Sequence, residues 1–291
     1  MEKNKEKKIR QPFNWKKELK LAPAYLILFA WVGFTAIVIG WIFAASLSTS
    51  REIFKGDVLK FASGFHWENY VTAWKTQNVS VFFANSLLYA TVSCIGILLI
   101  SAPAAYVLSR FTFLGNKTIK TSFVIGMSIP LIMIILPLFS ISTKMGLTGS
   151  RTLLIILYIC LNIPFTTTFL LNFFSNLSRS YEEAAAIDGC SPMKTFWIIM
   201  LPLAQPGIIT VTIFNFLAVW NEYFMALIFA NSDRMKSVGV GLFSMVAALK
   251  AVGDYGSLFA AVIIVFMPTF LLYVFLSEKI IAGVTGGGVK G

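Results

Sequence analysis

Chemically reactive side chains are scarce in this sequence. Its 291 residues include one histidine, His66, and three cysteines. Cys94 and Cys160 fall inside apolar stretches and Cys190 in a polar one, so their positions predict neither a disulfide framework nor a metal site. One histidine and no cluster of buried acids leave little for acid–base chemistry. We therefore expect no catalytic residues, no metal and no cofactor, which disfavours an enzyme.

Charge is also scarce. Only 13% of the residues are charged, against about 25% in a soluble domain, and 57% are hydrophobic. The apolar residues form six blocks, each long enough to cross a bilayer core of roughly 30 Å as a helix of about 20 residues. The stretch Thr152–Cys160 does not alternate in polarity, which argues against a membrane barrel. The sequence therefore predicts an all-α integral membrane protein with six transmembrane helices at Ala22–Leu47, Phe82–Leu108, Ile119–Ser142, Leu153–Phe174, Gly207–Phe229 and Ser257–Ile281.

The net charge of +11 would suggest a nucleic-acid partner in a soluble protein, but here eight of the basic residues lie in the first 20 positions. Positive charge beside the first span tends to stay in the cytoplasm, and it can contact anionic lipid headgroups. We expect no nucleic-acid partner, a plasma-membrane location and two cytoplasmic termini, although Arg51 and three lysines in the first external loop weaken this orientation. The predicted order is a basic cytoplasmic tail (1–20), a first transmembrane helix (21–47), an external loop (48–81), a five-helix core (82–282) and a Gly-rich cytoplasmic tail (283–291).

Five prolines lie within the predicted spans, and each removes a backbone donor and clashes with the preceding turn. They predict kinked or broken helices at Pro103, Pro130, Pro137, Pro164 and Pro268.

The predicted cytoplasmic loop 175–206 has helix signals of its own. Tyr181–Asp188 consists of strong helix formers, and Gly189 accepts the left-handed conformation that ends a helix. Ser191 followed by Pro192 is a typical helix start. The loop therefore predicts two short helices joined by a tight turn, lying flat beneath the membrane.

Seven residues of this loop have a characteristic spacing: Glu183, Ala184, Ala185, Gly189, Ile199, Leu201 and Pro202. In this pattern the chain resembles the permeases of binding-protein-dependent ABC importers. The resemblance implies the type I importer permease fold, with these residues and Asp188 forming a coupling helix that docks on a separate ATPase subunit. An interfacial amphipathic helix without a partner is the alternative.

The chain has no phosphate-binding loop of the Gly-x4-Gly-Lys-Ser/Thr type, since the segment Gly115–Thr118 lacks the preceding glycine. ATP hydrolysis is therefore expected in another subunit. The resemblance implies a heterodimer with a second permease subunit, two ABC ATPase subunits and an extracellular sugar-binding protein.

Two segments resemble the carbohydrate-importing branch, in particular its maltose-type second permease. They are Trp220–Tyr223 and the terminal Gly283–Gly291. In that branch the tail, here Gly286, Gly287 and Gly288, reaches between the ATPase subunits; a disordered terminus is the alternative. The same resemblance implies that the last external loop, 231–256, contacts the sugar-binding protein.

Glu222 is the only acidic residue well inside a predicted span, where a charge costs at least about 2.5–3.5 kcal/mol near the bilayer centre. It should therefore face a cavity or a partner. The candidate residues for the sugar pathway are Asn215, Trp220, Asn221, Glu222 and Tyr223. Alternatively, these residues form an interfacial aromatic belt in which Glu222 reaches water or braces the partner permease.

Other functions stay open on the sequence alone. They are an ion- or proton-coupled transporter or channel, and an ABC importer of glycerol-phosphate, amino acids or peptides.

Overall fold

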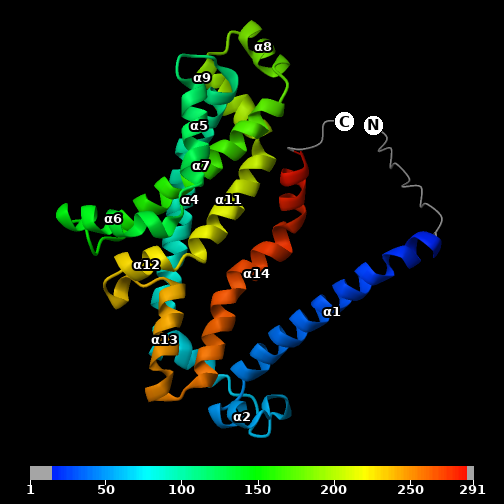
Figure 1. Ribbon diagram of the computed structural model, residues 1–291, viewed down its shortest axis with the longest axis vertical. Coiled ribbons are helices and arrows are strands. Elements are labelled where there is room, and N and C mark those ends of the chain that lie inside the picture. Colours follow the sequence, from blue (N-terminus) through cyan, green and yellow to red (C-terminus); the bar gives the residue numbers. More distant parts are fainter. Residues whose placement is uncertain (1–14, 287–291) are drawn as a thin grey trace.

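The computed structural model describes residues 15–286, and these form helices joined by turns (Figure 1). The four long helices are α1 (Trp15–Ser46), α4 (Val79–Arg110), α7 (Arg151–Asn176) and α14 (Tyr255–Gly286). Each contains a stretch long and apolar enough to cross a membrane, and two bent helix pairs raise the count to six if each pair is one span. The predicted all-α membrane fold is confirmed.

The shorter elements fill the connections between the long helices. In chain order they are α2 (Ser50–Lys55), η1 (Val58–Lys60), α3 (Glu68–Val71), η2 (Thr72–Thr76), α5 (Asn116–Met127), α6 (Leu131–Lys144), α8 (Ser180–Ile187), α9 (Pro192–Thr195), η3 (Phe196–Met200), α10 (Leu201–Leu203), α11 (Gln205–Trp220), α12 (Phe224–Phe229), η4 (Asp233–Met235) and α13 (Val238–Val252).

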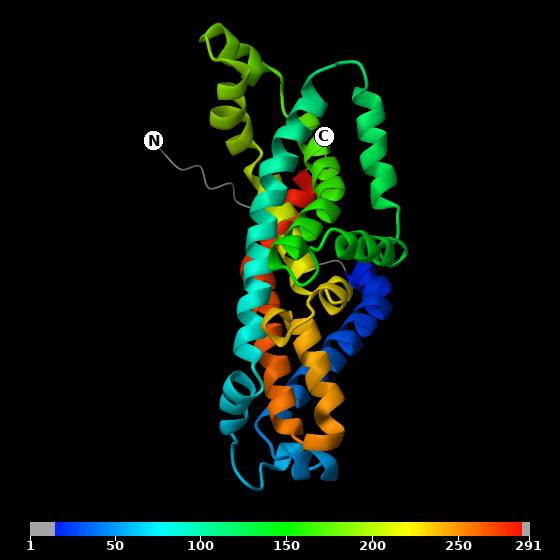
Figure 2. The same cartoon turned by 90° about the vertical axis from the view of Figure 1, so that its left-hand side faces the viewer.

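Helices α4, α7 and α11 pack against one another, and α14 packs on α11 (Figure 2). The buried face of α4 is rich in small side chains. Small residues let helix backbones approach closely in a membrane, where van der Waals packing drives association. The small buried residues of α4 are Ser86, Ala90, Ser93, Ser101, Ala102 and Ala105.

Helix α1 leans away from this bundle (Figure 1). It contacts α14 near its last turns, where the ring of Trp41 lies edge-on against Phe259 at a centroid distance of 5.4 Å. Ala44 and Ala45 are buried there, whereas most of the helix before them is exposed. The first predicted span is thus one helix joined to the rest mainly at one end.

The third predicted span, Ile119–Ser142, is a broken helix, as Pro130 within it predicted. The structure divides it into α5 and α6, which meet at an angle of 98°. The break falls at Ser128–Pro130, because Pro130 has no amide hydrogen to continue the helix and adopts an extended backbone with ψ of 130°. We call this break the elbow.

The fifth predicted span, Gly207–Phe229, is wrong at its end. Helix α11 stops at Trp220, and α12 begins at Phe224 after a break at Asn221–Tyr223. The segment is apolar again beyond the break, so hydropathy did not separate the two helices, although the polar residues Asn221 and Glu222 lie at the break.

The other four prolines lie inside continuous helices, so the predicted breaks occur at Pro130 alone among the five. Figure 1 nevertheless shows α14 bending along its length, as expected for a helix that contains Pro268.

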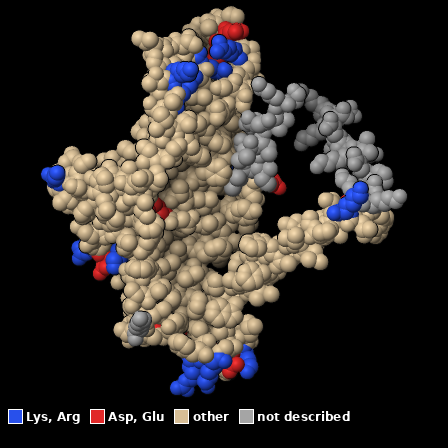
Figure 3. Space-filling model, in the orientation of Figure 1, with Lys and Arg blue, Asp and Glu red and all other residues tan. Residues whose placement is uncertain are grey.

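The long axis of the molecule separates two charged ends. On the face shown in Figure 3, charged side chains gather at the end formed by α8 and α9 and at the end formed by α2, with smaller groups at the outer tip of α6 and beside α12. The surface between the α8 end and the level of α6 is mostly uncharged, which fits a segment that lies in hydrocarbon.

Candidate functional site

Residues 180–203, which we call the hairpin, form the two short helices that the sequence predicted. Gly189 has a φ of +75°, and its amide bonds Ala186 O at 3.1 Å while the next amide bonds Ala185 O at 2.9 Å. Ser191 then accepts a hydrogen bond from Lys194 N at 3.4 Å, and Pro192 is the first residue of α9. The glycine ends one helix and the Ser-Pro pair starts the next, which fixes a tight turn.

The second half of the hairpin crosses the direction of the bundle. The segment Pro192–Leu203 meets α11 at an angle of 75°, and the turn between them is at Ala204. The hairpin thus projects from one end of the molecule, as Figure 1 shows.

One side of the hairpin packs into the bundle. Ala185, Phe196 and Met200 are buried. Phe196 lies against Tyr106 of α4, with ring centroids 5.1 Å apart, and against Phe174 of α7 at 6.3 Å. Two of the motif residues, Ile199 and Leu201, are half-buried against this same cluster.

The opposite side of the hairpin is exposed. Glu183, Ala184, Asp188, Gly189 and Pro202 all reach the surface. Large apolar side chains accompany them: Ile187 is 87% exposed and Met193 is 68% exposed. Five of the eight predicted coupling residues are therefore exposed, whereas Ala185, Ile199 and Leu201 pack toward the bundle. The eight are Glu183, Ala184, Ala185, Asp188, Gly189, Ile199, Leu201 and Pro202.

A neighbouring acid that sequence reasoning did not single out is the one that contacts the bundle. Glu182 Oε1 lies 3.2 Å from Nε of Arg110, the last residue of α4. The atoms do not meet hydrogen-bond angles, so the contact is an ion pair. The helical period could have shown that Glu182 and Glu183 face different sides, but not which side meets an arginine.

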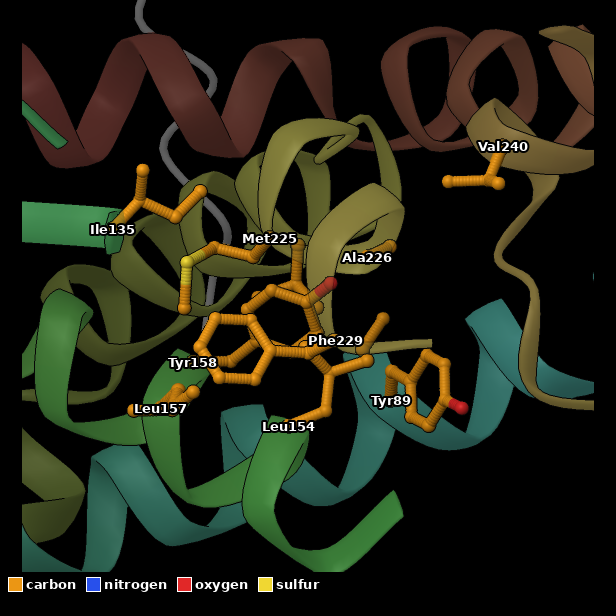
Figure 4. Close-up of a cluster of buried hydrophobic side chains, with 11 residues drawn as sticks. Tyr89, Ile135, Leu154, Leu157, Tyr158, Met225, Ala226, Phe229 and Val240 are labelled. Atoms are coloured by element: carbon orange, nitrogen blue, oxygen red, sulfur yellow. The ribbon is translucent and has the colours of Figure 1, made fainter. Parts of the chain in front are cut away.

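The predicted pathway residues gather at the break between α11 and α12. Glu222 accepts hydrogen bonds from Met225 N at 2.7 Å and Ala226 N at 3.1 Å, so its carboxylate caps the start of α12. It also accepts a bond from Tyr158 Oη of α7 at 2.9 Å. A buried hydrophobic cluster around Tyr158, Met225 and Phe229 holds α12 against α4 and α7 (Figure 4).

Beside this break lies a cavity of about 240 Å³. Its wall has few polar groups, and Tyr158, Asn162 and Glu222 supply them. The apolar part of its wall comes from α5, the elbow, α6, α7 and α11, and consists of Gly126, Met127, Ile129, Leu131, Ile134, Leu161, Ala218 and Val219. An apolar pocket with a few convergent polar groups is the usual form of a small-molecule site.

The other predicted pathway residues have different surroundings. Asn215 is buried and exchanges hydrogen bonds with Thr166 of α7, the shorter at 2.9 Å. Trp220 is buried and donates to Val265 O of α14 at 3.3 Å. Asn221 is exposed, and Tyr223 packs edge-on against Phe243 of α13. Asn215 and Trp220 therefore join helices, whereas Glu222 lines the cavity.

Of the predicted tail residues, Gly286 is the last residue of α14. Gly287 and Gly288 lie outside the described residues. The predicted external loop 231–256 contains a helix of its own, α13, which packs on α4 and α14.

A bundle of membrane-spanning helices that presents this motif on an exposed hairpin defines a membrane-embedded transport subunit. The chain belongs to the family of binding-protein-dependent transport system inner membrane components, whose model matches residues 95–285.

Two relatives illustrate the similarity. The chain is 34% identical over 269 residues to the diacetylchitobiose uptake system permease protein NgcG of Streptomyces coelicolor, covering 91% of this chain and 88% of the relative. It is 30% identical over 254 residues to the trehalose/maltose transport system permease protein MalG of Thermococcus litoralis, covering 86% and 90%. The resemblance to permeases of carbohydrate importers is thereby confirmed, and these relatives are named as permeases rather than enzymes.

The fold matches a solved structure as well. A crystal structure of a bacterial ABC transporter involved in the import of the acidic polysaccharide alginate has a chain that aligns with a TM-score of 0.79 at 22% identity, over 92% of this chain and 99% of that chain. The ABC importer permease fold expected from the sequence is confirmed.

Proposed function

We propose that this chain forms half of the translocation pathway of an ATP-driven carbohydrate importer. The hairpin is its contact with a separate ATPase subunit, and a second permease subunit supplies the other half of the pathway. An extracellular sugar-binding protein delivers the substrate. In this arrangement the hairpin end and both termini are cytoplasmic.

The observation that carries the proposal is the exposed apolar surface of the hairpin. Ile187 and Met193 flank the Gly189 turn at the end of the molecule that lies furthest from α2. Exposed apolar surface rimmed by polar residues marks a site of protein interaction. The small side chain of Ala184 allows close approach, and Glu183 and Asp188 offer charges that set the register of a partner.

The cavity beside Glu222 is the part of the pathway that this chain contributes. Aromatic and amide groups suit a sugar, since rings stack on its apolar faces while amides and carboxylates bond its hydroxyls. Tyr158, Asn162 and Glu222 supply these groups, and the buried residues Asn215 and Trp220 hold the surrounding helices in place. Asn221 and Tyr223 lie on either side of Glu222 in the same break.

A substitution in the turn tests the proposal. In Gly189→Leu the left-handed backbone costs about 1–2 kcal/mol, although nothing lies within 4 Å of the added Cβ. We expect the assembled complex to insert and bind sugar normally but to lose ATP hydrolysis stimulated by the binding protein. Gly189→Asn should retain most of it, because asparagine tolerates this conformation.

Gly56→Leu is the matched control. Gly56 has the same φ of +75° and the same open surroundings, but it ends α2 at the opposite end of the molecule. Equal losses in both leucine variants, or normal coupling in Gly189→Leu, would contradict the assignment. Uptake driven by a proton gradient without ATP would instead favour an ion-coupled transporter.

A further inference from the structure

Arg110 joins the hairpin to the end of α4. Besides its ion pair with Glu182, its Nη2 donates to Leu177 O at 2.8 Å, in the link between α7 and α8. The Arg110 side chain is 6% exposed and that of Glu182 is 19% exposed. We call Arg110, Glu182 and Leu177 the inner anchor.

The inner anchor is electrostatic in apolar surroundings. The pocket beside it, of about 230 Å³, is lined by the rings of Tyr106 and Phe111 and by one further arginine, Arg179, which is exposed. Removing one partner of a largely buried ion pair leaves the other charge uncompensated. Loss of either Arg110 or Glu182 should therefore strongly weaken the attachment of α8 to the end of α4. The end of α4 and the start of α8 therefore move as one unit while the pair is intact.

The other half of α4 holds a second loop by side-chain bonds. Asn85 Nδ2 donates to Arg234 O at 2.9 Å and to Lys236 O at 3.0 Å. Tyr89 Oη donates to the intervening carbonyl, Met235 O, at 2.9 Å. All these groups are buried or partly buried, so the loop has little freedom to slide along α4.

A fourth bond extends this attachment to the start of α13. Ser86 Oγ accepts from Val238 N, the first residue of α13, at 2.9 Å. We call Asn85, Ser86 and Tyr89 the outer anchor. The two anchors attach the same helix to segments of the chain that are far apart in space (Figure 2).

Helix α4 is uninterrupted between the anchors. The 21 steps from Tyr89 to Arg110 span about 32 Å at about 1.5 Å per residue, and Pro103 leaves the helix continuous. We infer that α4 transmits movement of the hairpin to α13 at the opposite half of the molecule, through the inner anchor at one end and the outer anchor at the other. The assumption that an ATPase bound to the hairpin drives this movement rests on the proposed function.

The test uses the complete complex in lipid vesicles, with spin labels on cysteines placed at two exposed positions. One label is at Met193 on the hairpin and the other at Val252 on α13. Each is paired with a reference label at exposed Phe34 of α1, the helix that leans away from the bundle (Figure 1). ATP-dependent distance changes are measured together with ATP hydrolysis stimulated by the binding protein.

In the parent complex ATP should shift both labels. In Arg110→Gln and Glu182→Gln the α13 label should respond less while the hairpin label still moves, because only the packing of Phe196 on Tyr106 then joins the hairpin to α4. Stimulated hydrolysis should fall roughly tenfold, within the 5–150-fold range of coupling between distant sites. The charge exchange Arg110→Glu with Glu182→Arg should restore part of both signals. Tyr89→Phe, which removes only one hydroxyl of the outer anchor, should weaken the α13 response and leave the hairpin response unchanged.

Arg179→Gln is the matched control, because it removes the same charge from the same pocket without touching the ion pair. An unchanged α13 response in Arg110→Gln would overturn the inference, and so would equal loss in Arg179→Gln or no rescue by the charge exchange. Failure of the parent hairpin to respond to ATP would instead count against the proposed function.

Discussion

The capping carboxylate of Glu222 gives a prediction that the geometry makes quantitative. Its three hydrogen bonds come from two amides of α12 and from the Tyr158 hydroxyl. Loss of a capping side chain costs about 0.5–2 kcal/mol. A side-chain hydrogen bond between membrane helices contributes about 0.6 kcal/mol on average and about 1.7 at most. Glu222→Ala should therefore lower the free energy of unfolding by about 1–4 kcal/mol.

The neighbouring variants divide this total. Tyr158→Phe removes the interhelical bond alone and should cost about 0.6–1.7 kcal/mol. Glu222→Gln keeps one acceptor oxygen and should cost less than Glu222→Ala. The double variant Tyr158→Phe/Glu222→Ala should be less destabilised than the sum of the two single variants, by about the energy of the shared bond.

The assay is denaturant-induced unfolding of the purified protein in mild detergent, with all four variants compared under one condition. If Glu222→Ala unfolds within about 0.5 kcal/mol of the parent protein, the size of an ordinary surface substitution, the carboxylate does not hold α12. Strict additivity in the double variant would show that the bond to Tyr158 contributes nothing.

Three further predictions concern other parts of the chain. Hydrogen bonds from the Thr49 amide and the Ser63 hydroxyl lower the pKa of Glu52 from its usual 4.5 to about 2. The contribution of Glu52 to the stability of the loop 49–63 should therefore be complete above about pH 4.5 and be lost as the pH falls toward 2. Hydrogen exchange across this loop should show that pH dependence in the parent protein and lack it in Glu52→Gln. Gly241→Ala would place a Cβ 2.1 Å from the buried ring of Phe82, so it should destabilise the packing of α13 on α4 by about 1–3 kcal/mol, whereas Gly253→Asn, at an open left-handed position, should unfold like the parent protein. Asn215→Ala should leave Thr166 without its interhelical bond and lower the free energy of unfolding by about 0.6–1.7 kcal/mol. The double variant Thr166→Val/Asn215→Leu should recover part of this loss in the same unfolding assay, because it leaves no polar group unpaired.

The hairpin could be predicted because its signals are local. Gly189, Ser191 and Pro192 determine the backbone within a few residues of themselves, and the structure shows the left-handed turn and the helix start that they imply. The hydropathy blocks likewise identified the long helices, since burial in lipid depends on composition along one segment.

Hydropathy does not show where a span bends, because a chain can remain apolar while it changes direction; the elbow was predicted by Pro130 instead. At the break after Trp220, Glu222 is held by a hydrogen bond from Tyr158, which lies 64 residues away in the sequence, and a contact of this kind cannot be read from local composition. The inner anchor was missed for the same reason: only the folded chain shows that Glu182, rather than Glu183, meets Arg110.

The elbow has a consequence for the permeability of the membrane. Helix α5 has 12 residues, which amounts to about 18 Å at about 1.5 Å per residue, whereas the bilayer core is about 30 Å thick. The chain at Ser128–Pro130 therefore turns before the core is crossed, and its carbonyls lose their helical partners at a depth where lipid offers none. Met127 and Ile129 border the cavity there. Non-helical backbone at this depth requires a protein partner or a water-filled cavity, so we expect this cavity to admit water, which would make the insulating layer thinner beside the elbow.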